Sequence, residues 1–200
     1  MGIAKRACVA VAALTVAATG LANAQETRSD AGRSPRHGLY VSAGVGGGSV
    51  GFECSVCLSD KRTDGAAGFL GLGGTLSPHW RLGAEADVWG RREGGVERAA
   101  VAIQFVAAWY PSRTGGFFVK AGLGGLAHVE DNGLVEVSAA GGSFMLGIGC
   151  DLRIAGSLAI TPYVTSIVTS RSTVQVNNVK IPGVEVNPNL AHFGLALSLL

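Results

Sequence analysis

The chain has 200 residues, of which 31 are glycine and 48% are hydrophobic, and its formal net charge is +2. So much glycine argues against a helical protein, because glycine costs a helix interior about 1 kcal/mol relative to alanine. The small net charge, without a basic patch or interleaved aromatic residues, excludes a nucleic-acid-binding surface of the usual kind.

The N-terminus has the pattern of a secretory signal peptide. Lys5 and Arg6 precede an apolar run at 7–21, and the small-residue triplet Ala-Asn-Ala follows at 22–24. A charged segment, an apolar segment and an Ala-x-Ala site in this order predict that residues 1–24 are removed by cleavage. A membrane anchor is the alternative, but the run is shorter than the roughly 20 residues that a spanning helix needs.

Removal of these 24 residues from 200 leaves 176, a length that suits one domain. The remaining chain carries 14 basic and 14 acidic residues, so it is electrically neutral. Residues 25–37 are polar and are predicted to form a flexible periplasmic leader, and residues 38–200 are predicted to form the domain. No run after residue 24 is long and apolar enough for a transmembrane helix.

Within 38–200, apolar residues recur at every second position, which is the period of a strand with one apolar face. The clearest case is a hairpin between 115 and 153, where one face is apolar and the other carries glycine and charge. Its apolar face contains Phe117, Val119, Ala121, Leu123, Ala127, Phe144, Leu146, Ile148, Cys150 and Leu152. The same pattern predicts six further strands, at about 38–50, 66–76, 79–91, 97–111, 158–169 and 190–200.

The connections between these eight strands alternate in length. Short turns are predicted near 77–78, 111–114 and 154–157, and longer loops at 51–65, 92–96, 129–139 and 170–189. In an antiparallel arrangement the two sets lie at opposite ends, which is the layout of an outer-membrane barrel. We therefore predict an all-β fold, an eight-stranded antiparallel up-and-down transmembrane β-barrel with its apolar face toward lipid. Closure of the barrel removes the sheet edges that lipid cannot satisfy.

The signal peptide, eight strands, short turns, glycine-rich inner face and C-terminal strand resemble the small outer-membrane β-barrel superfamily. That superfamily includes the transmembrane domain of outer-membrane protein A, the opacity-type surface proteins and the W-type barrels. The resemblance covers residues 38–200 and is architectural. It implies a monomer in the outer membrane that contacts lipid and lipopolysaccharide and is inserted by the barrel-assembly machinery. The chain departs from the pattern at Leu200, because such barrels usually end in Phe or Trp.

Charged residues recur on the face predicted to line the lumen. An eight-stranded barrel is just wide enough for side chains to fill its interior, so these charges must be paired. The predicted lumen charge network is Arg81, Glu85, Asp87, Arg91, Arg98, Lys120, Asp151 and Arg153. Glycines on the same face leave room for the long side chains. The network is interpreted as a plug, and the alternative is a narrow gated ion channel.

Cys54 and Cys57 lie in the first long loop, where a local disulfide is the best interpretation of Cys-x-x-Cys in an oxidising compartment. A structural zinc site would need four ligands, so no metal is predicted. Gly44–Ser49 is rich in glycine but lacks the Gly-Lys-Ser/Thr ending of a phosphate loop. No cofactor is predicted.

We predict a structural or surface-interaction protein without enzymatic activity. The long polar loops at 51–65 and 170–189 are suited to bind an extracellular ligand. One alternative is a lipid A-modifying enzyme that would use His128 or His192, near the ends of their strands. Its remaining groups would come from Glu130, Asp131, Ser138 and Ser170. Another alternative is a soluble, lipocalin-like periplasmic carrier, with the polar face outside.

Overall fold

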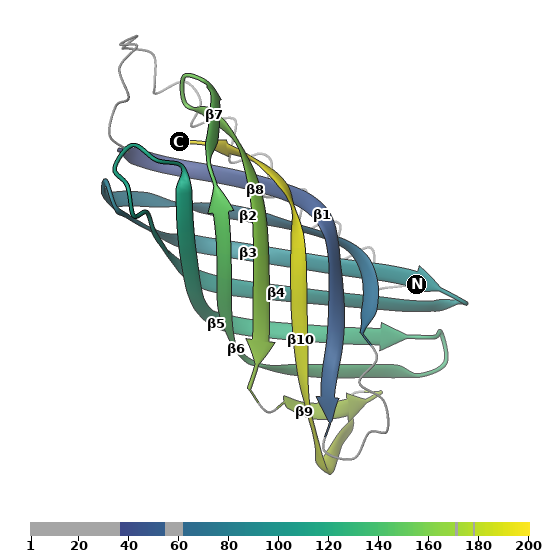
Figure 1. Ribbon diagram of the computed structural model, residues 1–200. Coiled ribbons are helices and arrows are strands. Elements are labelled where there is room, and N and C mark those ends of the chain that lie inside the picture. Colours follow the sequence, from purple (N-terminus) through teal and green to yellow (C-terminus); the bar gives the residue numbers. More distant parts are fainter. Residues whose placement is uncertain (1–36, 55–61, 171, 178) are drawn as a thin grey trace. The chain divides into compact units, whose positions relative to one another are not determined.

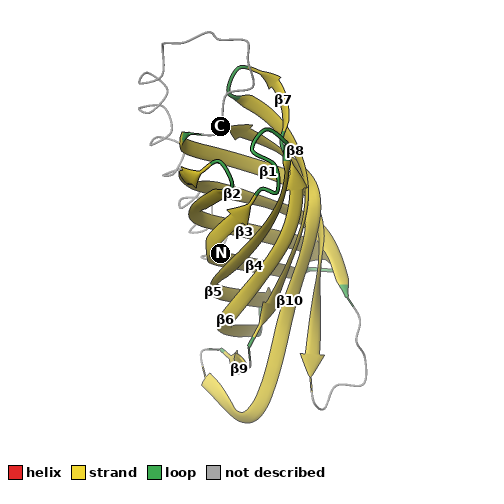
Figure 2. Cartoon of the chain, turned by 60° about the vertical axis from the view of Figure 1, so that its left-hand side comes forward, coloured by secondary structure: helices red, strands yellow, loops and turns green. Residues whose placement is uncertain are grey.

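The computed structural model describes residues 37–54, 62–170, 172–177 and 179–200, all within one compact unit that spans Arg33–Leu200. The predicted signal peptide, and the predicted leader up to residue 36, lie outside the described residues. Figure 2 shows that the described chain consists of strands and short loops. Among these residues, no helix is long and apolar enough to cross a membrane.

Ten strands form one antiparallel sheet that closes on itself (Figure 1). Closure comes from β1, which pairs with β2 along one edge and with β10 along the other. The strands are β1 (Gly38–Cys54), β2 (Thr63–Ser77), β3 (Trp80–Glu93), β4 (Val96–Trp109), β5 (Phe117–Asp131), β6 (Glu136–Cys150), β7 (Leu152–Ala155), β8 (Leu158–Thr169), β9 (Ser172–Val176) and β10 (Val179–Leu199).

The wall of the barrel has eight strand positions. The short β7 pairs with one end of β8, and β9 lies between β6 and β10 beyond the other end of β8. The eight wall strands are therefore β1, β2, β3, β4, β5, β6, β8 and β10, which confirms the predicted eight-stranded antiparallel barrel.

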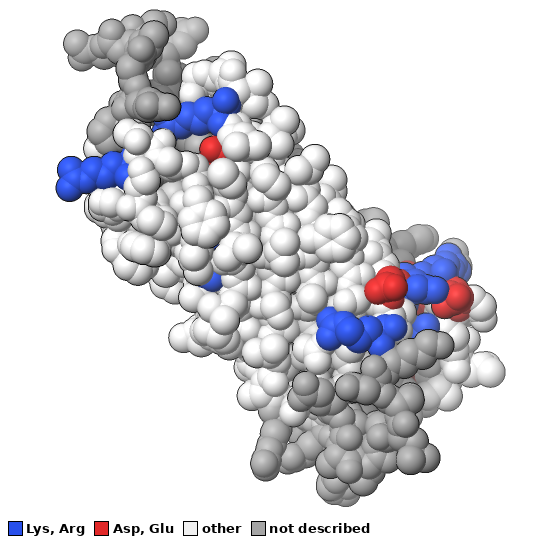
Figure 3. Space-filling view, viewed as in Figure 1, with Lys and Arg blue, Asp and Glu red and all other residues white. Residues whose placement is uncertain are grey.

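Alternation along each strand separates an outer apolar face from an inner face, as predicted. On β4, Ile103 is 65% exposed and Phe105 is 61% exposed, whereas Ala102, Gln104 and Val106 between and beside them are buried in the lumen. Figure 3 shows the result on one face, where charged residues gather at two ends and leave a broad belt almost without charge between them. A belt of exposed Leu, Ile, Val and Phe is the exterior of a barrel that faces lipid.

The strands extend further than the sequence pattern indicated. The loop predicted at 92–96 is a turn at Gly94 and Gly95, whose φ angles of 58° and 83° favour glycine. The loop predicted at 129–139 is reduced to 132–135. Both shifts have one cause, because the backbone ladder continues past the point where the apolar alternation ends.

The prediction of a long loop at 170–189 is wrong. This segment contains β9 and the first half of β10, which pair as a hairpin in which Val176 lies opposite Val179. Asn177, with a φ of 48°, reverses the chain between them. Asn is among the few residues other than glycine that tolerate this conformation. The polar sequence around Asn177 therefore marks a tight turn and not a long loop.

The short turns and both ends of the barrel wall, Gly38 and Leu199, lie at one end, called here the short-turn end. The opposite end is called the long-loop end. Three aromatic residues, Trp80, Trp109 and Phe117, are exposed on the outer face at the short-turn end. Three others, Tyr40, Trp89 and Phe118, turn into the lumen instead.

Candidate functional site

The candidate site is the interior of the barrel, because its inward-facing side chains include buried charges. Strand β3 passes through every level of the interior. From the short-turn end to the long-loop end, its inward residues are Arg81, Glu85, Asp87, Trp89 and Arg91. Each of these side chains lies in a different environment, so the inward residues of β3 define the successive levels of the lumen.

The first level is a hydrogen-bonded cluster around Asp151. Arg81 Nη1 lies 3.3 Å from Asp151 Oδ2 and donates a 2.8 Å hydrogen bond to the hydroxyl of Tyr110. That hydroxyl donates to Asp151 Oδ2 at 2.9 Å, and Thr161 Oγ1 donates to Asp151 Oδ1 at 2.8 Å. The Arg81 guanidinium also lies 5.2 Å from the centre of the Tyr40 ring. The carboxylate is therefore matched by three donors, as a buried charge requires.

The second level is the ion pair of Lys120 and Glu85, whose side chains are only 5% and 8% exposed. The Lys120 ammonium donates a hydrogen bond to Glu85 and lies 4.9 Å from the centre of the Phe69 ring. Gly147 makes room for this lysine, since a Cβ there would be 2.7 Å from Lys120 Cε. This confirms for one position that an inward glycine accommodates a long charged side chain.

The third level contains Asp87 and His192, whose side chains are both 0% exposed. His192 Nε2 lies 3.0 Å from Asp87 Oδ1, which is an ion-pair distance, but the geometry is not that of a hydrogen bond. The hydroxyls of Tyr163 and Thr165, beside His192, also find no hydrogen-bond partner among the described residues. This level is the least satisfied part of the polar interior.

A cavity of about 40 Å³ lies among the first two levels. Its lining includes both members of each ion pair, Arg81 with Asp151 and Glu85 with Lys120. That volume has room for a few water molecules, and the polar lining suits them. The polar half of the lumen, at the short-turn end, is therefore not fully packed.

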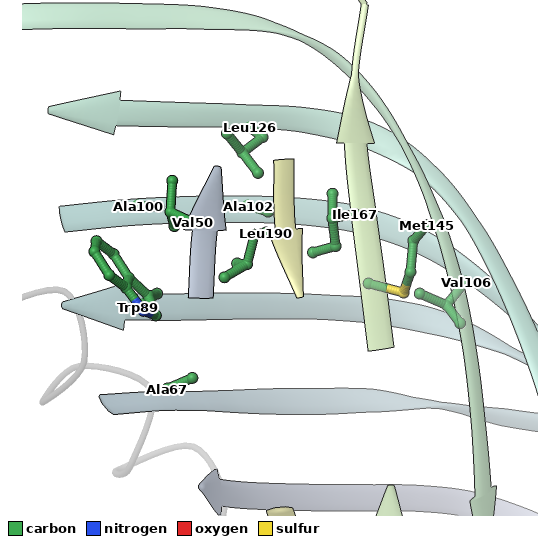
Figure 4. Packing of buried hydrophobic residues seen from close by; sticks show 10 residues of the cluster. All are labelled: Val50, Ala67, Trp89, Ala100, Ala102, Val106, Leu126, Met145, Ile167 and Leu190. Carbon is green, nitrogen blue, oxygen red and sulfur yellow. The ribbon is translucent and has the colours of Figure 1, made fainter. Parts of the chain in front are cut away.

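The fourth level is apolar and is called here the apolar layer (Figure 4). Every wall strand contributes at least one residue to the apolar layer, and each of these residues is at most 8% exposed. Its members are Val50, Ala67, Trp89, Ala100, Ala102, Val106, Leu126, Met145, Ile167 and Leu190, of which Val106 extends the cluster to the lining of the cavity. Phe52 packs against it, and the ring of His128 lies 4.7 Å from Phe52 and 6.4 Å from Trp89, centre to centre. The indole of Trp89 is satisfied by a 3.1 Å hydrogen bond to the carbonyl of Gly48.

The eight residues predicted as one lumen charge network occupy three places. Arg81, Glu85, Asp87, Lys120 and Asp151 are buried in the first three levels. Arg91 and Arg98 lie at the long-loop end, and they pair there with Glu93 at 2.8 Å and Glu130 at 2.9 Å. Arg153, on β7 at the short-turn end, is exposed.

Sequence reasoning missed two parts of the interior. Tyr110 and Thr161 share the Asp151 cluster, and His192 is the partner of Asp87, although the parity of Thr161 and His192 already placed both on the inner face. The apolar layer is the second part, because its residues interrupt the alternation from which the strands were predicted.

The structure separates the two histidines named for a lipid A-modifying enzyme. His128 and His192 are buried in different environments, Glu130 pairs with Arg98, and the Ser170 hydroxyl donates to the carbonyl of Gly142. Among the described residues, no three His, Cys, Asp or Glu side chains are grouped so that they could hold a metal ion. The side chain of Cys54, and Cys57 with its chain segment, lie outside the described residues, and Cys150 is a free thiol.

No family model matches the sequence, and no curated protein matches it. Solved structures do. The crystal structure of Neisserial surface protein A is similar with a TM-score of 0.59 and 11% identity, covering 80% of this chain and 96% of that one. This chain has the fold of the small eight-stranded outer-membrane β-barrels.

Two further solved structures are similar to this chain with lower TM-scores. The solid-state NMR structure of outer membrane protein AlkL has a TM-score of 0.49 and 12% identity, covering 87% of this chain and 96% of that one. The crystal structure of OprG from Pseudomonas aeruginosa has a TM-score of 0.47 and 8% identity, covering 83% and 98%.

Proposed function

We propose that this chain is an outer-membrane β-barrel with a closed lumen, and that it has a structural or surface-interaction role without enzymatic activity. The observation that carries the proposal is an apolar outer belt around an interior that contains a buried apolar layer. An exposed apolar belt is stable in lipid. If the lumen is closed, other molecules can bind the barrel only at its two ends.

The long-loop end is the side that would face outward from the cell, since both ends of the barrel wall lie at the other side. Its charges of both signs include Arg62, Arg91, Glu93, Arg98 and Glu130. This rim suits contacts with lipopolysaccharide or an extracellular ligand. Insertion by the barrel-assembly machinery and export by a signal peptide cleaved after Ala24 belong to the same proposal, and the mass of the mature protein tests the cleavage.

Gel mobility and conductance together test the proposal. The protein from an outer-membrane fraction is run on SDS gels with and without boiling, and then reconstituted in planar bilayers. We expect a heat-dependent shift in mobility, which reports a detergent-resistant barrel, and no resolvable single-channel openings. A soluble periplasmic protein without a mobility shift would instead support the carrier, and steady openings of the native protein would support the gated channel. Mass spectrometry of lipid A on expression covers the enzyme, and we expect unchanged acylation.

A further inference from the structure

The side chains of the apolar layer meet in the lumen from all sides of the wall. Its residues come from all eight wall strands, and four of them form a continuous row across neighbouring strands. In that row Val50 lies opposite Leu190, Leu190 opposite Ile167, and Ile167 opposite Met145. These four side chains are at most 2% exposed, so solvent does not reach this row.

The polar levels differ from the apolar layer in what they offer an ion. The cavity among them is lined by Arg81, Glu85, Lys120 and Asp151, and charges and hydroxyls of this kind can replace the water around a small ion. The side chains of the apolar layer have almost no polar groups that could replace the water around an ion. The N–H of the Trp89 indole already donates a hydrogen bond to the carbonyl of Gly48. Hydrophobic constrictions of this kind block ions because water leaves them.

We propose that the apolar layer, and not the buried ion pairs, is the barrier to ions in this barrel. The inference rests on the proposed closed lumen and names the residues that close it. The ion pairs then stabilise the polar half of the lumen. The apolar layer, which blocks ions, lies between the ion pairs and the long-loop end. Polar groups placed in the row should let water and ions pass, and loss of an ion pair should not.

The test adds hydroxyl and amide groups to the row and removes at most one non-hydrogen atom from each side chain. Leu190→Asn with Ile167→Thr is the main variant, since Asn has nearly the shape of Leu and Thr that of Val. Its volume-matched control is Ile167→Val, which keeps the row apolar. Val50→Thr with Ile167→Thr is a milder second variant that has the same control and keeps β-branched residues at both positions. Glu85→Gln with Lys120→Met removes both charges of one ion pair.

The readout is ion flux from liposomes that contain folded protein, with heat-dependent gel mobility as the test of folding. We expect both row variants to release ions roughly tenfold faster than Ile167→Val, with openings in planar bilayers, because a wetted constriction conducts. The ion-pair variant is expected to stay as tight as the native protein. If the main variant does not fold, the milder one decides.

Two results would overturn the inference. One is folded row variants that are as tight as their control, and the other is an ion-pair variant that leaks as fast as the row variants. A native protein that already conducts is a different result, because it overturns the closed lumen and with it the proposed function. The failure of the inference and the failure of the proposed function are thus separate outcomes.

Discussion

Loss of one charge from the buried ion pair of Lys120 and Glu85 should be costly, and loss of both charges should cost much less. Lys120→Met keeps most of the side-chain stem but leaves the Glu85 carboxylate without its partner. Both side chains are less than a tenth exposed, so solvent screens the charge little. Removal of one member of such a pair typically costs about 3–5 kcal/mol, because the other charge stays buried and unpaired.

The double variant Glu85→Gln with Lys120→Met separates this effect from lost packing. Replacement of both members of a buried ion pair is often neutral within a few kcal/mol, so we expect the second change to recover at least half of the loss. Lys180→Met, at an exposed lysine on β10, is the matched control and should change stability by less than about 1 kcal/mol.

The assay is equilibrium unfolding in urea of protein refolded into lipid vesicles, with the folded fraction taken from unboiled gel mobility. The free energies of unfolding are compared for the native protein, the two single variants and the double variant. The dependence of the unfolding free energy on urea concentration is held the same for all four. A loss below about 1 kcal/mol for Lys120→Met would refute the reasoning. So would a double variant no more stable than that single variant, since the cost would then lie in packing and not in an unpaired charge.

Three further changes test the walls of the barrel. Gly44→Ala should cost about 1–3 kcal/mol of unfolding free energy, because its Cβ would lie 2.3 Å from a buried aromatic ring, whereas Gly74→Ala meets nothing within 4 Å and should be neutral. Leu123→Arg, in the exposed apolar belt, should cost about 2–4 kcal/mol in vesicles, while Leu134→Arg, in the exposed loop at 132–135, should cost at most about 1 kcal/mol; equal costs would contradict a lipid-facing belt. Arg62→Ala should speed amide hydrogen exchange at the long-loop ends of β1 and β10, which its side chain joins through three hydrogen bonds, and unchanged exchange there would exclude that role.

The strands were predictable because period-2 alternation is imposed by the two faces of the wall. Their ends were not, because beyond the belt both faces meet water and the alternation stops while the hydrogen-bond ladder continues. At the long-loop end Arg92 pairs in register with Glu97, and Arg98 with Glu130. Opposite charges on neighbouring strands stabilise such a ladder without any apolar pattern.

Parity placed Arg81, Glu85 and Asp87 on the inner face, but Arg153 is exposed and the grouping of the buried charges was not predictable. Parity assigns a residue to a face, and it says nothing of the level at which the side chain meets those of other strands. Arg81 and Asp151 are 70 positions apart in sequence and lie 3.3 Å apart in the barrel. The contact between Arg81 and Asp151 is determined by the register of all the strands that lie between these two residues.

The apolar layer did leave a trace in the sequence, at places where alternation fails. At its level the wall has apolar residues on both faces, since lipid covers the outside and the layer itself fills the inside. A strand buried on both faces reads as a continuous apolar run. Such runs occur on seven of the eight wall strands, at Ala66–Ala67, Val88–Trp89, Ala99–Ile103, Leu126–Ala127, Phe144–Leu146, Ile167–Val168 and Leu190–Ala191. On β3, β4 and β5 these runs lie in register, since Trp89 is opposite Ala100 and Ala102 is opposite Leu126, so the interruptions of the alternation coincide there with the apolar layer.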